Sequence, residues 1–147
     1  MTISANDLAR IVRTIWSTQL GLELKDGDTE TLERGLAARE TITVGVKFSG
    51  GFSGALVQRC SQKVSVAAAS AAFTANEGEL GSTDARDVLA ELAHVTAGNL
   101  KSILPGQSEL SFPITVEPDE DMGSLVTEAG FELQGEPLIV RLTQHQA

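Results

Sequence analysis

Apolar residues recur at helical spacing in two long segments of the chain. In residues 7–20 they fall on one stripe, made of Leu8, Ile11, Val12, Ile15, Trp16 and Leu20. This spacing predicts a helix that is capped at Asn6 and ends at Gly21, with Trp16 in the core beside its aliphatic neighbours. Residues 84–104 predict a longer helix that begins at polar residues 82–84 and ends before Pro105. Its core-facing arc would hold Ala85, Val88, Leu89, Leu92, Val95, Thr96, Asn99, Leu100 and Ile103.

Strict alternation of apolar and polar residues marks the strands. Residues 41–48 alternate, with Ile42, Val44, Val46 and Phe48 on one side, and a glycine turn then leads into a second strand at 54–60. Residues 125–133 and 137–142, separated near Gly135, predict a second pair of strands. Pro113 makes the segment 109–116 an edge strand or a bulge.

The remaining segments give weaker patterns. Residues 61–73 are rich in alanine and predict a helix of small residues capped by Ser61, while residues 22–25 suggest a short strand. The segments 76–81 and 118–121 are predicted loops, and the polar stretch 29–40 is left unassigned.

Together these elements predict an α+β fold with a largely antiparallel sheet. The length of 147 residues suits a single domain spanning 1–147. Shifting the chain by 84 positions aligns residues 7–12 with 91–96, so the fold is also compatible with two copies of one unit about a pseudo-two-fold axis. The first copy has Arg10 where the second has His94.

Composition narrows the possible partners. The chain has 20 acidic and 11 basic residues, a net charge of −9, and no basic cluster, which disfavours nucleic acid and anionic membrane surfaces as partners. No apolar run approaches the roughly 18 residues of a membrane span. A single cysteine, Cys60, and a start without the basic and apolar regions of a secretion signal favour a cytoplasmic location.

The outer face of the long predicted helix carries the candidate chemistry. Glu91 and His94 lie three residues apart, so their side chains project side by side, and Gly98 leaves a bare spot where another backbone could approach. Asp87 and Lys101 share this face, although each of these charges taken singly is better explained as part of a solvated helix surface. Asn99 projects toward the apolar side, where its amide would have a structural role.

Three stretches resemble a known family. The sequences Gly51-Phe-Ser-Gly54, Glu91-Leu-Ala-His-Val-Thr-Ala-Gly-Asn-Leu-Lys101 and Leu110-Ser-Phe-Pro113 are similar to those of the CheX members of the CheC/CheX family of chemotaxis phosphatases. The resemblance covers about residues 42–115. It implies two long helices on one face of the sheet, a homodimer, and hydrolysis of the aspartyl phosphate of a phosphorylated CheY-like receiver domain. It implies no cofactor of the chain's own, because the Mg²⁺ belongs to the receiver.

The family's catalytic pattern is Glu-x-x-Asn, and this chain has Glu91 and His94 at those positions. The resemblance implies that Glu91 pairs with a lysine of the receiver, while residue 94 holds a water in line with the phosphorus. A neutral imidazole offers one donor and one acceptor on a planar ring, unlike a carboxamide. Reduced hydrolysis, hydrolysis with His94 orienting or deprotonating the water, and binding without hydrolysis all stay open.

Two other functions compete with a phosphatase. A non-catalytic receiver-binding adaptor of the same fold would be comparable to flagellar switch components. A metal site is the third hypothesis, because Glu-x-x-His is half of the di-iron motif of helical bundles, although no second copy of the motif is present. In the first two hypotheses, Asp87, Gly98 and Lys101 are candidate partner contacts.

Overall fold

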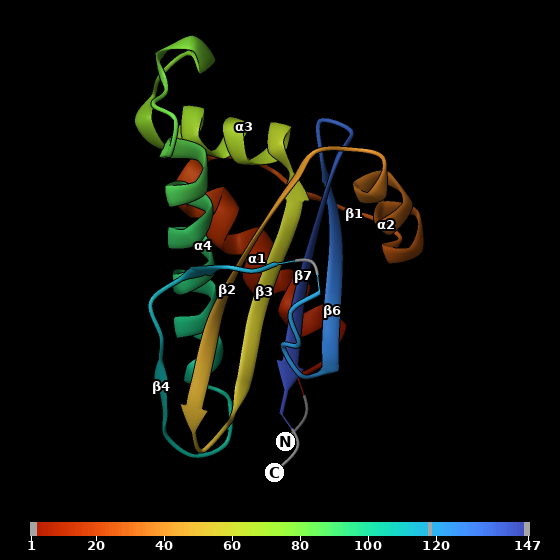
Figure 1. Cartoon of the computed structure of the whole chain (residues 1–147), viewed down its shortest axis with the longest axis vertical. Helices are drawn as coiled ribbons and strands as arrows, with labels where there is room; N and C mark the ends of the chain where they lie inside the picture. The colour runs from red at the N-terminus through yellow and green to blue at the C-terminus, as the bar shows by residue number, and fades with distance from the viewer. Residues whose placement is uncertain (1–2, 118, 146–147) are drawn as a thin grey trace.

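The computed structural model describes residues 3–117 and 119–145, and within these it has a seven-stranded antiparallel sheet with helices on both faces (Figure 1). The strand order is β1-β6-β7-β3-β2-β4, and β5 also pairs with β2. The α+β class and the antiparallel sheet are therefore confirmed. The helices are α1 (Ala5–Leu20), α2 (Thr29–Ala37), α3 (Gln62–Phe73) and α4 (Asp84–Lys101), with a 3₁₀ turn η1 (Glu77–Glu79). The strands are β1 (Lys25–Asp26), β2 (Thr41–Gly50), β3 (Gly54–Ser61), β4 (Ser108–Leu110), β5 (Ile114–Thr115), β6 (Ser124–Leu133) and β7 (Glu136–Gln144).

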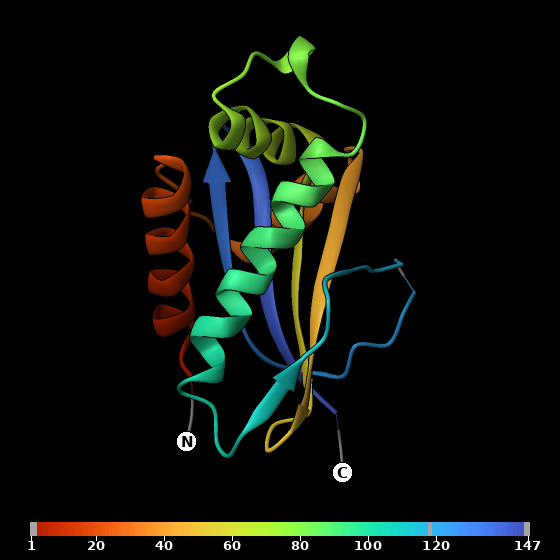
Figure 2. The ribbon, with the colours of Figure 1, turned by 90° about the vertical axis from the view of Figure 1, so that its left-hand side faces the viewer.

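The two long helices, α1 and α4, lie on one face of the sheet, with α3 across its end (Figure 2). The apolar side of each strand points at them: Val44, Val46 and Phe48 of β2 are buried there, as the alternation predicted. Trp16 is fully buried in this core, also as predicted. The small residues of α3 bring that helix close to α4, and Ser61 caps it by accepting a hydrogen bond from the backbone N–H of Val64.

The opposite face is covered in part by α2, which the sequence left unassigned. Asp28 caps this helix by accepting a 3.0 Å hydrogen bond from the backbone N–H of Thr31. Only Leu32 and Leu36 are buried, and both pack on Ile139 of β7. Glu33 also ties the helix to the sheet through ion pairs with Arg59 and Arg141. The signal in the sequence was weak because only two apolar residues, one turn apart, mark the buried side of so short a helix.

Several predicted boundaries were wrong by a few residues. Ser4, not Asn6, caps α1, because Ser4 and Asp7 form a reciprocal capping box that satisfies two backbone N–H groups. The predicted strand at 22–25 is reduced to β1, which begins at Lys25, and the predicted loop at 76–81 contains η1. The long helix ends at Lys101 instead of continuing to Leu104.

The segment after α4 forms the edge of the sheet, as Pro113 suggested. Glu109 pairs with Ser49 and Ile114 pairs with Gly45, so both β4 and β5 run antiparallel to β2. The ladder is interrupted at 111–113, the position of the proline. Residues 119–121 form no helix or strand, while Pro118 of this predicted loop lies outside the described residues.

The hairpins lie at the centre of the sheet, with β3 pairing with β7 from Gly54↔Gln144 to Cys60↔Leu138. The internal repeat stays a prediction. No helix in the described part of the chain combines the length and apolar character needed to cross a membrane.

Candidate functional site

Helix α4 fixes the direction of every residue predicted for the site. Its buried side faces the sheet and α1 and consists of Val88, Leu89, Ala90, Leu92, Ala93, Thr96, Ala97 and Leu100. On the opposite side of the helix, Asp87, Glu91, Gly98 and Lys101 are exposed, and His94 lies half-buried among them. The structure therefore brings all five predicted residues to one outward face, which we call the outer face of α4. Their roles stay predictions.

The carboxylate of Glu91 forms no ion pair or side-chain hydrogen bond with the described residues, and the same holds for the ammonium group of Lys101. Asp87 differs, because its Oδ1 lies 3.4 Å from Nη1 of Arg86. A partner could thus pair with Glu91 or Lys101 without breaking an existing contact, whereas Asp87 is already in part neutralised.

His94 presents its two ring nitrogens differently. Nδ1 is buried and has no hydrogen-bond partner among the described residues, whereas Nε2 is not enclosed. Buried N–H groups without an acceptor are rarer in proteins than buried acceptors without a donor. We therefore assign the proton of the neutral ring to Nε2. In that tautomer His94 donates one hydrogen bond outward and has no outward lone pair with which to take a proton.

Asn99 does not lie where the sequence placed it. It is exposed, and its Nδ2 donates a 2.9 Å hydrogen bond to the carbonyl of Val95 in the same helix. The buried stripe of α4 is rotated relative to the predicted arc, because it also includes Ala90, Ala93 and Ala97 and stops short of Asn99. Helix α3 packs on α4 in addition to the sheet and α1. Ile103, placed on the same arc, follows the end of the helix and is 39% exposed.

The neighbouring edge of the sheet borders the outer face of α4. Near the start of the helix, Nε of Arg86 donates a 2.8 Å hydrogen bond to Oγ1 of Thr115 in β5. Near its end, Gly98 and Lys101 line a groove whose far wall includes residues 107–109. Phe112, between β4 and β5, is 89% exposed. Helical spacing could not predict that β4 and β5 lie beside the outer face of α4, because this arrangement depends on tertiary contacts. Only the motif Leu110-Ser-Phe-Pro113 marked the segment.

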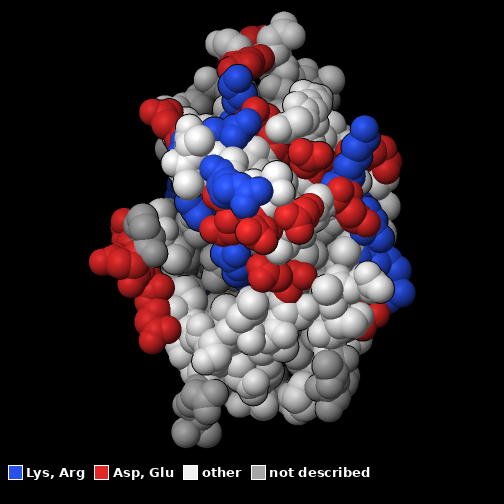
Figure 3. Space-filling view, turned by 90° about the vertical axis from the view of Figure 1, so that its right-hand side faces the viewer, with Lys and Arg blue, Asp and Glu red and all other residues white. Residues whose placement is uncertain are grey.

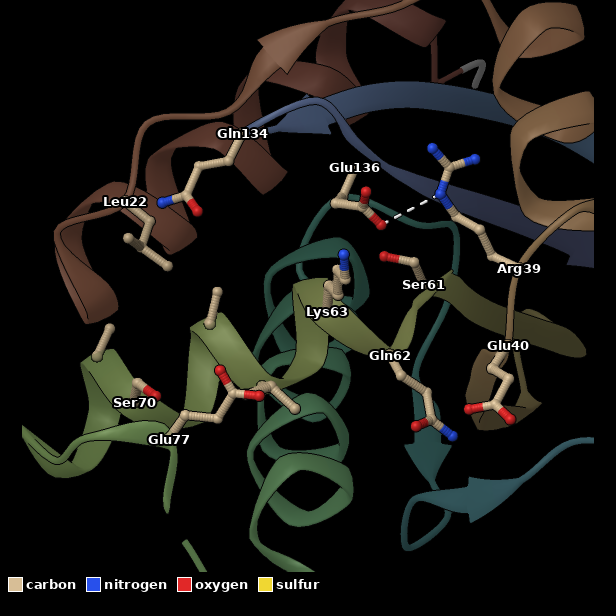
Figure 4. A pocket seen from close by; sticks show the side chains of 13 residues that line it. Leu22, Arg39, Glu40, Ser61, Gln62, Lys63, Ser70, Glu77, Gln134 and Glu136 are labelled. Atoms are coloured by element: carbon tan, nitrogen blue, oxygen red, sulfur yellow. Dashed lines mark hydrogen bonds and ion pairs between the residues drawn. The ribbon is translucent and has the colours of Figure 1, made fainter. Parts of the chain in front are cut away.

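A cavity of about 930 Å³ lies elsewhere, at the end of the molecule that α3 covers (Figure 4). Val66, Ala67 and Ala71 supply an apolar wall, and Arg39 forms a 3.2 Å ion pair with Glu136 beside it. None of the five residues predicted for the site lines this cavity. The cavity and the outer face of α4 are therefore separate features.

Within the described residues, no group of three or more His, Cys, Asp and Glu side chains is arranged to hold a metal ion. Glu91 and His94 can offer at most two ligands, one carboxylate and one imidazole. Structural and catalytic zinc sites use three or four protein ligands. By themselves, Glu91 and His94 fall short of that number.

Solved structures of similar fold span almost the whole chain. The chemotaxis protein CheX from Vibrio vulnificus has a TM-score of 0.72 at 16% identity, with 94% of this chain and 93% of that chain covered. CheX in the CheX–CheY–BeF₃–Mg²⁺ complex from Borrelia burgdorferi has a TM-score of 0.70 at 14% identity, with 95% and 96% covered. The FliM middle domain from Vibrio alginolyticus is more distant, with a TM-score of 0.56 at 12% identity and coverage of 95% and 90%. At these identities the likeness shows the fold alone.

Comparison of the sequence with family models is more specific. The model described as chemotaxis phosphatase CheX matches residues 42–131, which include β2 apart from its first residue, the whole of β3, α3 and α4, and most of β6. A search of curated proteins found no significant match. The matched segment makes up more than half of the chain and contains the whole outer face of α4, so this protein belongs to the CheX family of chemotaxis phosphatases.

Proposed function

We propose that this protein binds a phosphorylated CheY-like receiver domain and hydrolyses its aspartyl phosphate, with Glu91 and His94 as the residues that enter the receiver's pocket. The observation that carries the proposal is the outward projection of both side chains from α4, a helix held along its length by eight buried residues. The CheX–CheY complex among the similar structures supports a receiver as the kind of partner.

In the proposed mechanism, Glu91 anchors the complex. Its carboxylate has no competing cation among the described residues, so it can form an ion pair with a lysine of the receiver. Such a pair, once shielded from water in the interface, fixes the register of α4 over the phosphorylated pocket. Asp87, Gly98 and Lys101 lie along the same outer face and would contact the receiver around this anchor.

His94 would position the attacking water. The Nε2–H group donates a hydrogen bond to the water oxygen and leaves its other lone pair directed at phosphorus. The new P–O bond forms as the bond to the aspartyl oxygen breaks, and the aspartate leaves as a carboxylate with its electron pair. An acyl phosphate is already reactive, so positioning, together with the charge stabilisation that the receiver's Mg²⁺ supplies, suffices. The water's proton passes to a phosphate oxygen or to solvent, because the assigned tautomer leaves His94 no outward acceptor.

An imidazole at position 94 supports slower hydrolysis than the asparagine of the family's catalytic pattern would. A carboxamide offers both a donor and an acceptor to the water, whereas His94 offers only the donor. The imidazole also differs from a carboxamide in reach, and a displacement of about 1 Å in a positioned group can cost on the order of a hundredfold in rate. We therefore propose impaired hydrolysis on a retained binding surface.

A non-catalytic adaptor is the second candidate. The histidine where the family's catalytic pattern has asparagine favours it, and the FliM middle domain shows that the fold is not restricted to CheX proteins. The adaptor would bind the receiver through the same outer face of α4 and leave the lifetime of the phosphate unchanged. Rate measurements separate the two candidates, because both predict binding.

The test is a time course of phosphate loss from a cognate receiver, with and without the protein. We expect faster loss with the wild type, and no acceleration with Glu91→Lys, which places like charges opposite each other. Glu30→Lys is the matched control, because Glu30 is an exposed acid on α2, on the opposite face of the sheet, and we expect it to behave as the wild type. Saturable binding without acceleration would favour the adaptor.

We further propose that the chain forms a homodimer through the first half of β6. Phe131 and Glu132 of this strand pair with β1, and the carbonyl of Gly130 accepts a hydrogen bond from Gly27 N–H, so within the described part of the chain residues 124–129 form an open edge. Leu125 and Val126 are exposed there, and the lower part of this side of the molecule lacks charged side chains (Figure 3). An open apolar edge is a ready site for pairing with a second chain. A receiver of a two-component system would place this dimer in the cytoplasm.

A further inference from the structure

Gly98 lies in the middle of the last two turns of α4, where no contact with the described residues requires a glycine. It is exposed, and a Cβ built on it would meet no atom within 4 Å. Gly35, the other glycine within an α-helix of the described residues, is different, because its Cβ would lie 3.2 Å from Arg39 Nη1 and 3.6 Å from Pro137 Cγ. Replacing an exposed helical glycine by alanine favours folding by about fivefold in the equilibrium constant. Gly98 thus weakens the helix with no benefit inside the chain.

A preformed groove of about 890 Å³ lies beside Gly98. Lys101 at the end of α4 and Ser102, which follows it, form one wall, and the end of β2 with residues 106–109 forms the other. Hydrogen bonds hold the second wall: Gly51 N–H donates to the carbonyl of Gln107 at 2.8 Å, and Phe52 N–H donates to Oγ of Ser108 at 2.9 Å. The lining is mainly polar, and this suits a main-chain segment, whose N–H and C=O groups need partners when buried.

We propose that Gly98 and this groove receive a main-chain segment of the receiver, the one that borders its aspartyl-phosphate pocket. The inference rests on the proposed function, because it takes the position of the pocket from Glu91 and His94. Gly98 follows His94 by four residues, about 6 Å along the helix, so a receiver seated on His94 must pass over it. The missing side chain lets that backbone approach α4 closely, and the groove accepts the continuation of the segment.

The close approach gives Gly98 opposite effects on the free and the bound protein. A methyl group at position 98 strengthens the helix in the free protein. In the complex it holds the receiver's backbone away and shifts Glu91 and His94 relative to the pocket, and misplacement by about 1 Å costs on the order of a hundredfold in a positioned reaction. Higher stability together with weaker binding is the signature of this arrangement.

The experiment measures the melting temperature and the Kd for a cognate receiver activated with beryllium fluoride and Mg²⁺. We expect Gly98→Ala to melt higher than the wild type and to bind at least about tenfold more weakly. Gly98→Leu, with a larger side chain, is expected to remain folded and to lose measurable binding. Thr18→Ala is the matched control, because Thr18 is an exposed residue of α1 whose replacement also strengthens a helix. We expect it to melt higher with an unchanged Kd.

The outcomes separate this inference from the proposed function. Wild-type affinity in Gly98→Ala would overturn the inference and leave the proposed function standing. A lower melting temperature for Gly98→Ala would also overturn it, because the glycine would then serve the fold. Failure of the wild type to bind any cognate activated receiver would overturn the proposed function, and this inference with it.

Discussion

The side-chain amide of Gln58 in β3 donates a 3.4 Å hydrogen bond to the backbone carbonyl of Leu89 in α4, two residues before Glu91. Gln58 is fully buried, and its Oε1 has no partner among the described residues. The contact joins the centre of the sheet to the helix that carries the candidate site. Within the described residues it is the one buried side-chain hydrogen bond between the sheet and α4, and apolar packing supplies most of the remaining attachment.

Replacing Gln58 by glutamate should destabilise the protein strongly. The two side chains have the same shape, but a carboxylate would face the carbonyl oxygen of Leu89 in a core that excludes water. We expect a loss of about 3 kcal/mol or more in the free energy of unfolding at neutral pH, measured by urea denaturation. Gln58→Leu is the control, since it removes the hydrogen bond without burying a charge, and a loss of less than about 1.5 kcal/mol is expected. Equal losses in the two variants would contradict the buried, dry setting of Gln58.

The thiol of Cys60 should be unreactive in the folded protein. Burial raises the pKa of this thiol from 9.0 to about 12, so little nucleophilic thiolate exists at neutral pH. We expect the thiol reagent DTNB to label Cys60 only after unfolding in urea. Because the pKa of the thiol is higher in the folded than in the unfolded protein, burial of the neutral thiol contributes fully to the free energy of unfolding below pH 9.0. This contribution is lost as the pH rises above that value toward 12. Rapid labelling of the native protein would show that β3 is more accessible than the structure indicates.

A charge on the open edge of β6 should prevent dimer formation. Leu125→Lys would place an ammonium group in the proposed interface, and we expect a monomer by light scattering at concentrations where the wild type is a dimer. Phe73→Lys is a matched control, because Phe73 and Leu125 are both 53% exposed and Phe73 lies at the end of α3. A dimer that survives Leu125→Lys would exclude this edge as the interface.

The sequence predicted those features that many residues specify together. Four alternating apolar residues defined β2, and the long apolar stripe of α4 fixed its phase well enough to turn Glu91 and His94 outward. Helix α2 was missed because only Leu32 and Leu36 of its residues are buried, and the ion pairs of Glu33 with Arg59 and Arg141 leave no periodic signal in the sequence. Asn99 was misplaced because the elements that pack against α4 decide which side of the helix is buried, and the buried side includes Ala93 and Ala97 instead of Asn99. The groove beside Gly98 could not be predicted, since its far wall comes from residues 106–109 and the end of β2.

The measurement that tests the account most directly is the rate of dephosphorylation of a cognate receiver with the wild type beside His94→Asn. A carboxamide restores the second contact to the water that the imidazole lacks. We therefore expect acceleration by the wild type and about tenfold greater acceleration by His94→Asn, at equal receiver affinity. A His94→Asn variant that binds the receiver and yet leaves its dephosphorylation no faster than the receiver alone would contradict the account.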